Sequence, residues 1–146
     1  MTNEHEQVAA RGEAVTESRD TAIAAALAAA SKQADDVVIL DVHGLIVITD
    51  YFVIATGSSD RQVKTIVDEI ETALRDRDRK PVRREGETDG RWVLLDYVDV
   101  VVHVFAEAER DFYDLERLWL DAPRLSWDAD AVAEAGSLDS RAQPGP

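Results

Sequence analysis

Carboxylates that follow the Gly57-Ser58-Ser59 sequence are the side chains that could support metal-dependent chemistry. Nucleotidyltransferases place two alternating carboxylates on a strand, a short interval after a Gly-Ser pair, and hold magnesium with them. Here the interval contains Asp68-Glu69, which are adjacent in a predicted helix and cannot both reach one metal ion in strand geometry. Asp96 and Asp99 are separated across a turn, which is also the wrong spacing. The sequence therefore predicts no metal site and no catalytic residue.

Gly57-Ser58-Ser59 could by itself hold an anion, because it stands between a predicted strand and a helix start. It lacks the lysine of a phosphate-binding loop and the spaced glycines of a dinucleotide site. A nucleotide-binding remnant of a nucleotidyltransferase stays open as an alternative, as does an adaptor for some basic protein.

Histidine and cysteine chemistry is sparse. The chain has no cysteine, which excludes disulfides, thiolate metal sites and a cysteine nucleophile. Of the three histidines, His103 shares a predicted strand face with Val101 and Phe105, which favours a core or edge role over catalysis. His43 lies near Asp41, but no nucleophile is placed beside them.

Aromatic residues are more informative. By strand alternation Trp92 points with Leu94 and Asp96, and Tyr97 points to the opposite face. Aromatic side chains dominate binding hot spots, so a tryptophan on the same face as a carboxylate is a candidate for a partly exposed anchor. Packing of Trp92 in the core is the alternative.

Charge narrows the class of partner. The 146 residues carry 30 acidic and 16 basic side chains, a formal charge of −14. This balance repels phosphate backbones and favours a basic protein partner over direct recognition of nucleic acid, unless it serves solubility alone. No apolar run approaches the ~20 residues that span a bilayer, and the polar, acidic start does not resemble a secretory signal. We therefore expect a cytoplasmic protein without a membrane segment.

The elements that position these residues alternate between helix and strand. Residues 1–18 are predicted to be flexible, residues 19–120 to form one domain, and residues 121–146 to be a disordered acidic tail in which Trp127 alone could dock. Helices are predicted at residues 21–33, from Ser59 onward and around residues 112–119, with strands at residues 37–40, 51–56, 92–95 and 100–105. Ser59 and Gln62 fit a capping box. The pattern predicts an α/β (α+β) fold with a mixed sheet of about five strands covered by helices.

Residues 37–119 closely resemble the RsfS/Iojap family, the ribosomal silencing factors. The matching stretches are Leu40-Asp41-Val42, Thr49-Asp50-Tyr51-Phe52-Val53-Ile54, Gly57-Ser58-Ser59 with Arg61-Gln62-Val63, Glu85-Gly86, Trp92-Val93-Leu94-Leu95-Asp96-Tyr97, Asp99-Val100-Val101-Val102-His103-Val104-Phe105, and Arg110, Phe112, Tyr113, Leu115, Glu116, Leu118 and Trp119. One departure is Val98, where the family usually has glycine in the hairpin. A β-branched residue is costly at positive φ, so the turn here is expected to be of another type or strained.

The resemblance implies a nucleotidyltransferase-like fold that lacks the catalytic carboxylates and needs no cofactor. It implies binding to ribosomal protein L-fourteen on the large subunit, which blocks small-subunit joining and represses translation when nutrients fail. It further implies a link to large-subunit assembly and a homodimer off the ribosome. By motif, Trp92 is the first candidate for a partner contact, with Asp96, Tyr97, Asp99 and Tyr113 as weaker candidates.

Overall fold

A six-stranded mixed sheet forms the centre of the protein. The computed structural model describes the backbone of residues 4–127 and the side chains of residues 17–127 other than Phe112, Tyr113 and Leu118. The elements are α1 (Glu4–Ser31), β1 (Asp35–Asp41), β2 (Tyr51–Gly57), α2 (Asp60–Arg75), β3 (Arg83–Glu85), β4 (Trp92–Asp96), β5 (Val100–Ala106), α3 (Glu107–Tyr113), α4 (Leu115–Leu118) and β6 (Arg124–Leu125).

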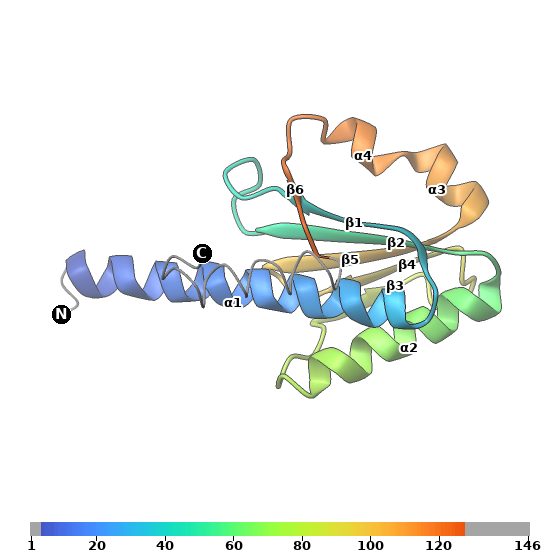
Figure 1. Ribbon diagram of the computed structural model, residues 1–146, viewed down its shortest axis with the longest axis horizontal. Helices are drawn as coiled ribbons and strands as arrows, with labels where there is room; N and C mark the ends of the chain where they lie inside the picture. The colour runs from blue at the N-terminus through green and yellow to red at the C-terminus, as the bar shows by residue number, and fades with distance from the viewer. Residues whose placement is uncertain (1–3, 128–146) are drawn as a thin grey trace, which may run out of the picture.

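The strand order is β3-β4-β5-β2-β1-β6. β2 and β5 are parallel, and every other neighbouring pair is antiparallel. Helices α1 and α2 cover one face of the sheet, and the short α3 and α4 lie across the other (Figure 1). The predicted mixed α/β fold is confirmed. The sheet has more strands than the sequence indicated because β3 and β6 are three and two residues long and carry no apolar alternation.

The helical face, covered by α1 and α2, holds the main hydrophobic core. α2 buries its apolar residues, which recur at helical spacing and are Val63, Ile66, Val67, Ile70 and Leu74. α1 contributes small side chains, which are Ala22, Ala25, Ala26, Ala28 and Ala29. Because alanine has the highest helix propensity, α1 can form without a wide apolar stripe. Because alanine side chains are small, α1 can also pack closely.

α1 begins earlier than predicted. The sequence predicts a helix from Thr21 and a flexible segment over residues 1–18, whereas the helix runs from Glu4. Residues 4–20 contain four Glu, three Ala and two Arg, which extend a helix at little cost once packing has formed its C-terminal half. Whether residues 1–18 move independently of the domain stays a prediction.

The capping residues of α2 also fasten α1. Ser59 Oγ accepts a hydrogen bond from the Gln62 amide at 3.1 Å, as the capping box predicts. The Gln62 side chain reaches one residue further back than expected and accepts from the Ser58 amide at 2.6 Å. Its Nε2 donates to the carbonyls of Lys32 and Gln33 at 3.2 and 3.0 Å. Gln62 thereby joins the start of α2 to the residues that follow α1.

The domain extends beyond residue 120, which corrects the predicted boundary of the tail. β6 pairs with β1 through Leu125 opposite Ile39 and Arg124 opposite Leu40. Trp127 docks as the sequence suggested it could, and its Nε1 donates to the Val37 carbonyl at 2.8 Å. This edge strand was not predicted because its two residues depend on a partner strand more than 80 positions earlier. Residues 128–146 lie outside the described residues.

The β4–β5 connection contains the departure noted at Val98. Val98 has φ of +76°, and the Asp99 amide donates to the Tyr97 carbonyl at 3.0 Å, the two features of a γ-turn. Asp96 Oδ1 accepts from the Val98 amide at 2.8 Å and holds the turn in place. Val98 is therefore kept in a backbone conformation that β-branched residues disfavour.

Val98→Gly is expected to stabilise the protein by about 0.5–1 kcal/mol, since relief of the left-handed strain exceeds the added entropy of glycine in the unfolded chain. Urea unfolding at equilibrium measures the change. Val98→Ala is the matched control, because it keeps Cβ and should recover less. A glycine variant less stable than the natural protein would show that the turn is not strained.

Candidate functional site

The second face of the sheet, here called the open face, is only partly covered. Its strand residues are Val38, Leu40, Phe52, Ile54, Trp92, Leu94, Asp96, Val101, His103 and Phe105. Leu115, Trp119 and Ala122 pack against Leu40, Ile54 and Phe105. Over β4 and the start of β5 the side chains of Trp92, Leu94, Asp96 and Val101 stay partly exposed. α3 and α4 have seven and four residues, too few to cover the whole sheet.

Trp92 is held firmly within this open face. Its ring stacks on Phe105 with centroids 4.9 Å apart and lies 6.0 Å from the ring of His103. Phe52 continues the row with edge contacts to His103 at 5.2 Å and Trp119 at 5.6 Å. A partly exposed indole with a fixed orientation loses little entropy when a partner covers it. The structure thus gives Trp92 the geometry of an anchor.

His103 sets the orientation of that indole. Trp92 Nε1 lies 3.1 Å from His103 Nδ1, and because an indole can only donate, Nδ1 accepts and the imidazole proton is on Nε2. His103 is 6% exposed, and its Nε2 has no hydrogen-bond partner among the described residues. Burial lowers the pKa of His103 to about 4. This matches the structural role that its strand position favoured.

The protein is expected to lose about 2 kcal/mol of unfolding free energy between pH 7 and pH 5 through His103 alone. The folded pKa of about 4 lies below the ordinary histidine pKa of 6.5, so the unfolded chain binds the extra proton and stability falls as the pH drops through this window. Urea unfolding of the natural protein and of His103→Gln at both pH values isolates this effect from that of the carboxylates. Equal pH dependence in the two proteins would contradict it.

Asp96 shares the open face with Trp92, as alternation predicted. Its Oδ2 lies 3.3 Å from the Arg83 guanidinium, and its Oδ1 holds the Val98 amide. Asp96 therefore stabilises the hairpin turn through one oxygen, and its carboxylate also lies next to the partly exposed residues of β4.

Tyr97 and Asp99 are not brought together with Trp92. Tyr97 is 3% exposed among the core residues of the helical face, and burial together with nearby Glu71 raises its pKa to about 12. A partner cannot reach this ring, so Tyr97 does not belong to the contact surface of the open face. The side chain of Tyr113 lies outside the described residues.

Asp99 instead connects three segments of the fold. It forms an ion pair with Arg79 and accepts a hydrogen bond from Ser18 Oγ at 2.6 Å. Burial alone would raise the pKa of Asp99, but the hydrogen bonds from Arg79 and Ser18 outweigh burial and lower it. Asp99 thus ties α1 and the segment after α2 to the β4–β5 turn, and this supports a structural role.

The start of α2 offers little to an anion. The amides of Ser58 and Gln62 already donate to side chains of the same turn. A Cβ at Gly57 would come within 2.8 Å of Val63, so close packing of α2 on β2 accounts for the glycine. These contacts weaken the nucleotide-binding alternative.

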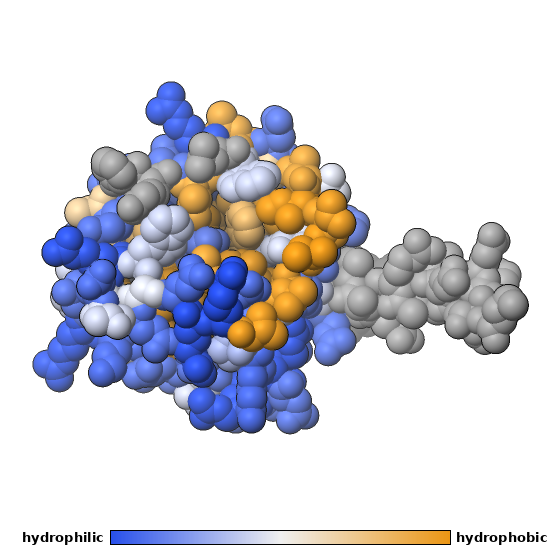
Figure 2. Space-filling model, turned by 180° about the vertical axis from the view of Figure 1, so that it is seen from behind, coloured by the Kyte–Doolittle hydropathy of each residue, from blue (hydrophilic) through white to orange (hydrophobic). Residues whose placement is uncertain are grey.

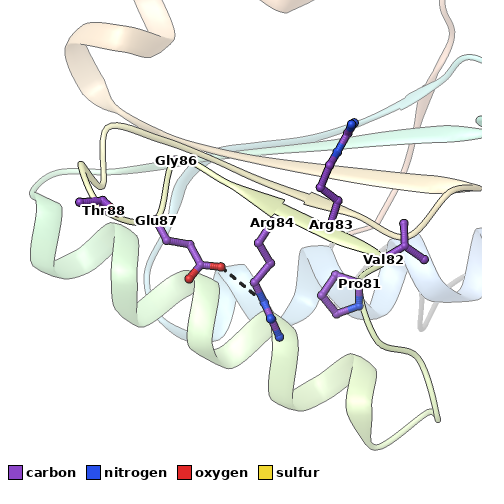
Figure 3. A pocket seen from close by; sticks show the side chains of 7 residues that line it. All are labelled: Pro81, Val82, Arg83, Arg84, Gly86, Glu87 and Thr88. Atoms are coloured by element: carbon purple, nitrogen blue, oxygen red, sulfur yellow. Dashed lines mark ion pairs between the residues drawn. The ribbon is translucent and has the colours of Figure 1, made fainter.

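A pocket beside β3 is also poorly suited to an anionic ligand. Arg83 and Arg84 point to opposite sides of the strand (Figure 3). Arg83 pairs with Glu85 and Asp96, and Arg84 pairs with Glu71 at 2.7 Å and with Glu87. Both guanidinium groups are therefore already neutralised by carboxylates.

Sequence reasoning missed a buried ionic network under α3 and α4. Arg110 is 8% exposed and donates to Thr56 Oγ1 at 2.7 Å and from two nitrogens to Glu116 Oε1 at 2.9 and 2.7 Å. Arg124 binds the second oxygen of Glu116 at 2.9 Å. The only signal in the sequence was the presence of Arg110 and Glu116 in the family motif.

Within the described residues, no three His, Asp or Glu side chains are grouped to hold a metal ion. Over the same part of the chain, no helix has the length and apolar character required to cross a bilayer.

Known proteins resemble this chain in both sequence and structure. A family model described as "Ribosomal silencing factor during starvation" matches residues 15–144. The ribosomal silencing factor RsfS of Bacillus subtilis is 44% identical over 104 residues, which cover 71% of this chain and 88% of that protein. A mouse protein named for mitochondrial assembly of the ribosomal large subunit is 31% identical over 60% of this chain and 40% of its own length. A crystal structure of a Chromobacterium violaceum protein is 35% identical, with a TM-score of 0.66 over 79% of this chain and 92% of that one. The chain therefore belongs to the family of ribosomal silencing factors.

Proposed function

We propose that this protein binds the large ribosomal subunit through ribosomal protein L-fourteen and prevents the small subunit from joining. Translation is thereby repressed when nutrients are limiting. Membership of the silencing-factor family supports this proposal, as do relatives named for ribosomal silencing. The proposed action is steric, because a bound protein that overlaps the incoming subunit blocks joining without a cofactor or a chemical step. Its proposed location is the cytoplasm.

The observation that carries the proposal is the partly exposed, rigidly held Trp92 on the open face. A tryptophan in such a position can fill a pocket on a partner and act as a hot spot. Charge supports a basic protein as that partner, since a chain with a net charge of −14 attracts cationic surfaces and is repelled by ribosomal RNA.

The proposal includes a role in large-subunit assembly, which the name of the mouse relative supports. A factor bound to an unfinished large subunit would protect the same surface until the particle is complete. Off the ribosome, the proposed state is a homodimer, which sedimentation equilibrium of the purified protein can test.

Subunit association in sucrose gradients tests the central claim. Purified large and small subunits are mixed at a magnesium concentration that supports joining, with increasing amounts of this protein. The intact-ribosome peak should decline as the protein saturates the large subunit, and the protein should migrate with the large-subunit peak. An unchanged intact-ribosome peak at saturation would refute the proposal.

A further inference from the structure

Five exposed aliphatic residues gather at one end of the sheet, here called the apolar end. They are Leu45, Val47, Ile48, Val82 and Val98, with exposures of 51%, 101%, 69%, 68% and 45%. Figure 2 shows hydrophobic residues gathered in the right-hand part of the view, whereas hydrophilic residues fill the lower left. Single exposed aliphatics are ordinary on protein surfaces, but a contiguous group of this kind marks a contact site.

Three separate segments build the apolar end, and hydrogen bonds join them. Thr49 Oγ1, in the β1–β2 loop, donates to the Val98 carbonyl at 3.1 Å. The Asp50 amide donates to the Asp99 carbonyl at 2.7 Å, and the Val82 amide donates to the Asp96 carbonyl at 2.8 Å. The β1–β2 loop, the β4–β5 turn and the residue before β3 therefore form one surface.

The loop that supplies three of these residues is held in a defined shape. The Leu45 and Ile46 amides donate to the Val42 carbonyl at 2.9 and 3.0 Å, and Gly44 takes the required φ of +87°. His43 Nδ1 lies 3.1 Å from Asp50 Oδ1 and closes the base of the loop. A loop ordered before binding loses less entropy when a partner covers it.

The apolar end is continuous with the open face. Ile46 packs against the same cluster as Phe52 and Trp92, and Val98 lies two residues after the end of β4. Trp92 and Asp96 are separated by about 13 Å along β4 at the usual rise of a strand. A typical interface covers about 800 Å² on each partner, so one protein could cover both surfaces.

Charge beside the Leu45–Ile48 loop indicates the chemistry of that protein, whereas the cations Lys80 and Arg83 flank Val82 in the sequence. Asp41 and Asp50 are at the margin of this loop, and within the described residues neither forms an ion pair with lysine or arginine. A second acidic copy of this chain would bring like charges together there, whereas a basic partner would supply opposite charges.

We infer that the apolar end is a second contact region for the basic large-subunit protein that covers Trp92, with its aliphatic residues packed against apolar side chains of that protein. This inference rests on the proposed function and assigns the Leu45–Ile48 loop a role in affinity.

Val47→Asp tests the inference in the full-length protein. Val47 is fully exposed, so the change should leave thermal unfolding unchanged while it places a charge in the contact. Binding to purified large subunits is expected to weaken at least about tenfold. Thr65→Asp is the matched control, because it adds the same charge to the exposed surface of α2 and should bind like the natural protein.

The possible outcomes separate the two proposals. If Val47→Asp binds normally while Trp92→Ala does not, the inference fails and the proposed function stands. If both variants bind normally, the inference fails and Trp92 also lies outside the contact. If the natural protein itself does not migrate with large subunits, the proposed function fails. If Val47→Asp binds subunits normally but no longer self-associates in sedimentation equilibrium, the apolar end contacts a second copy and the inference is overturned.

Discussion

Trp92→Ala is expected to weaken binding to the large ribosomal subunit at least about tenfold. The variant removes the partly exposed indole, its stack on Phe105 and its hydrogen bond to His103. A partner that packs on this ring loses its central apolar contact and faces a hollow in the open face. Co-sedimentation with purified large subunits over a range of salt concentrations measures the change in affinity.

Two further variants separate loss of contact from loss of folding. Trp127→Ala removes a tryptophan that packs with the core of the helical face, so it should lower the unfolding temperature without weakening subunit binding. Trp92→Phe keeps an aromatic ring and should bind between the natural protein and the alanine variant. A folded Trp92→Ala protein with natural affinity would remove Trp92 from the interface.

Glu116→Ala should lower the free energy of unfolding by about 3 kcal/mol, because it leaves the Arg110 guanidinium buried without its carboxylate. The loss is large relative to the total stability of a small domain, which is about 5–15 kcal/mol. The substitution should weaken the attachment of α3 and α4 to the sheet, since Arg110 also binds Thr56 on β2. Urea unfolding at equilibrium measures it.

A double-mutant cycle shows whether the buried charge is the cause. Arg110→Met replaces the cation by an apolar side chain of similar length and should cost less than Glu116→Ala. The Arg110→Met/Glu116→Ala double variant should recover part of the stability lost in Glu116→Ala. Additive losses in the double variant would mean that the two side chains contribute independently.

Local patterns were sufficient for much of the fold. The apolar stripe of α2 follows from helical spacing, and its cap from Ser59 and Gln62, because both depend on residues within one or two turns. Alternation along β4 placed Trp92 with Asp96 and opposite Tyr97, since side chains of a strand alternate whatever the partner strands are. The short strands β3 and β6 had no such pattern and depend on distant pairing.

Local patterns were not sufficient to predict the candidate site. Alternation separates Trp92 from Tyr97, but only packing of α1 and α2 on one face buries Tyr97 and leaves Trp92 partly exposed. Asp99 was a candidate contact from its motif, and its bonds to Arg79 and Ser18 arise from segments 20 and 81 positions away.

The sequence by itself determined the family, the order of the main helices and strands, and the alternation that puts Trp92 and Asp96 on one face, because each is encoded in local spacing or in ordered motifs. Only the tertiary structure decided which face stays open, which charges are buried as Arg110 is, and that aliphatic residues from three segments meet at the apolar end. These features depend on which distant surfaces pack together, and residue spacing along the chain does not contain that information.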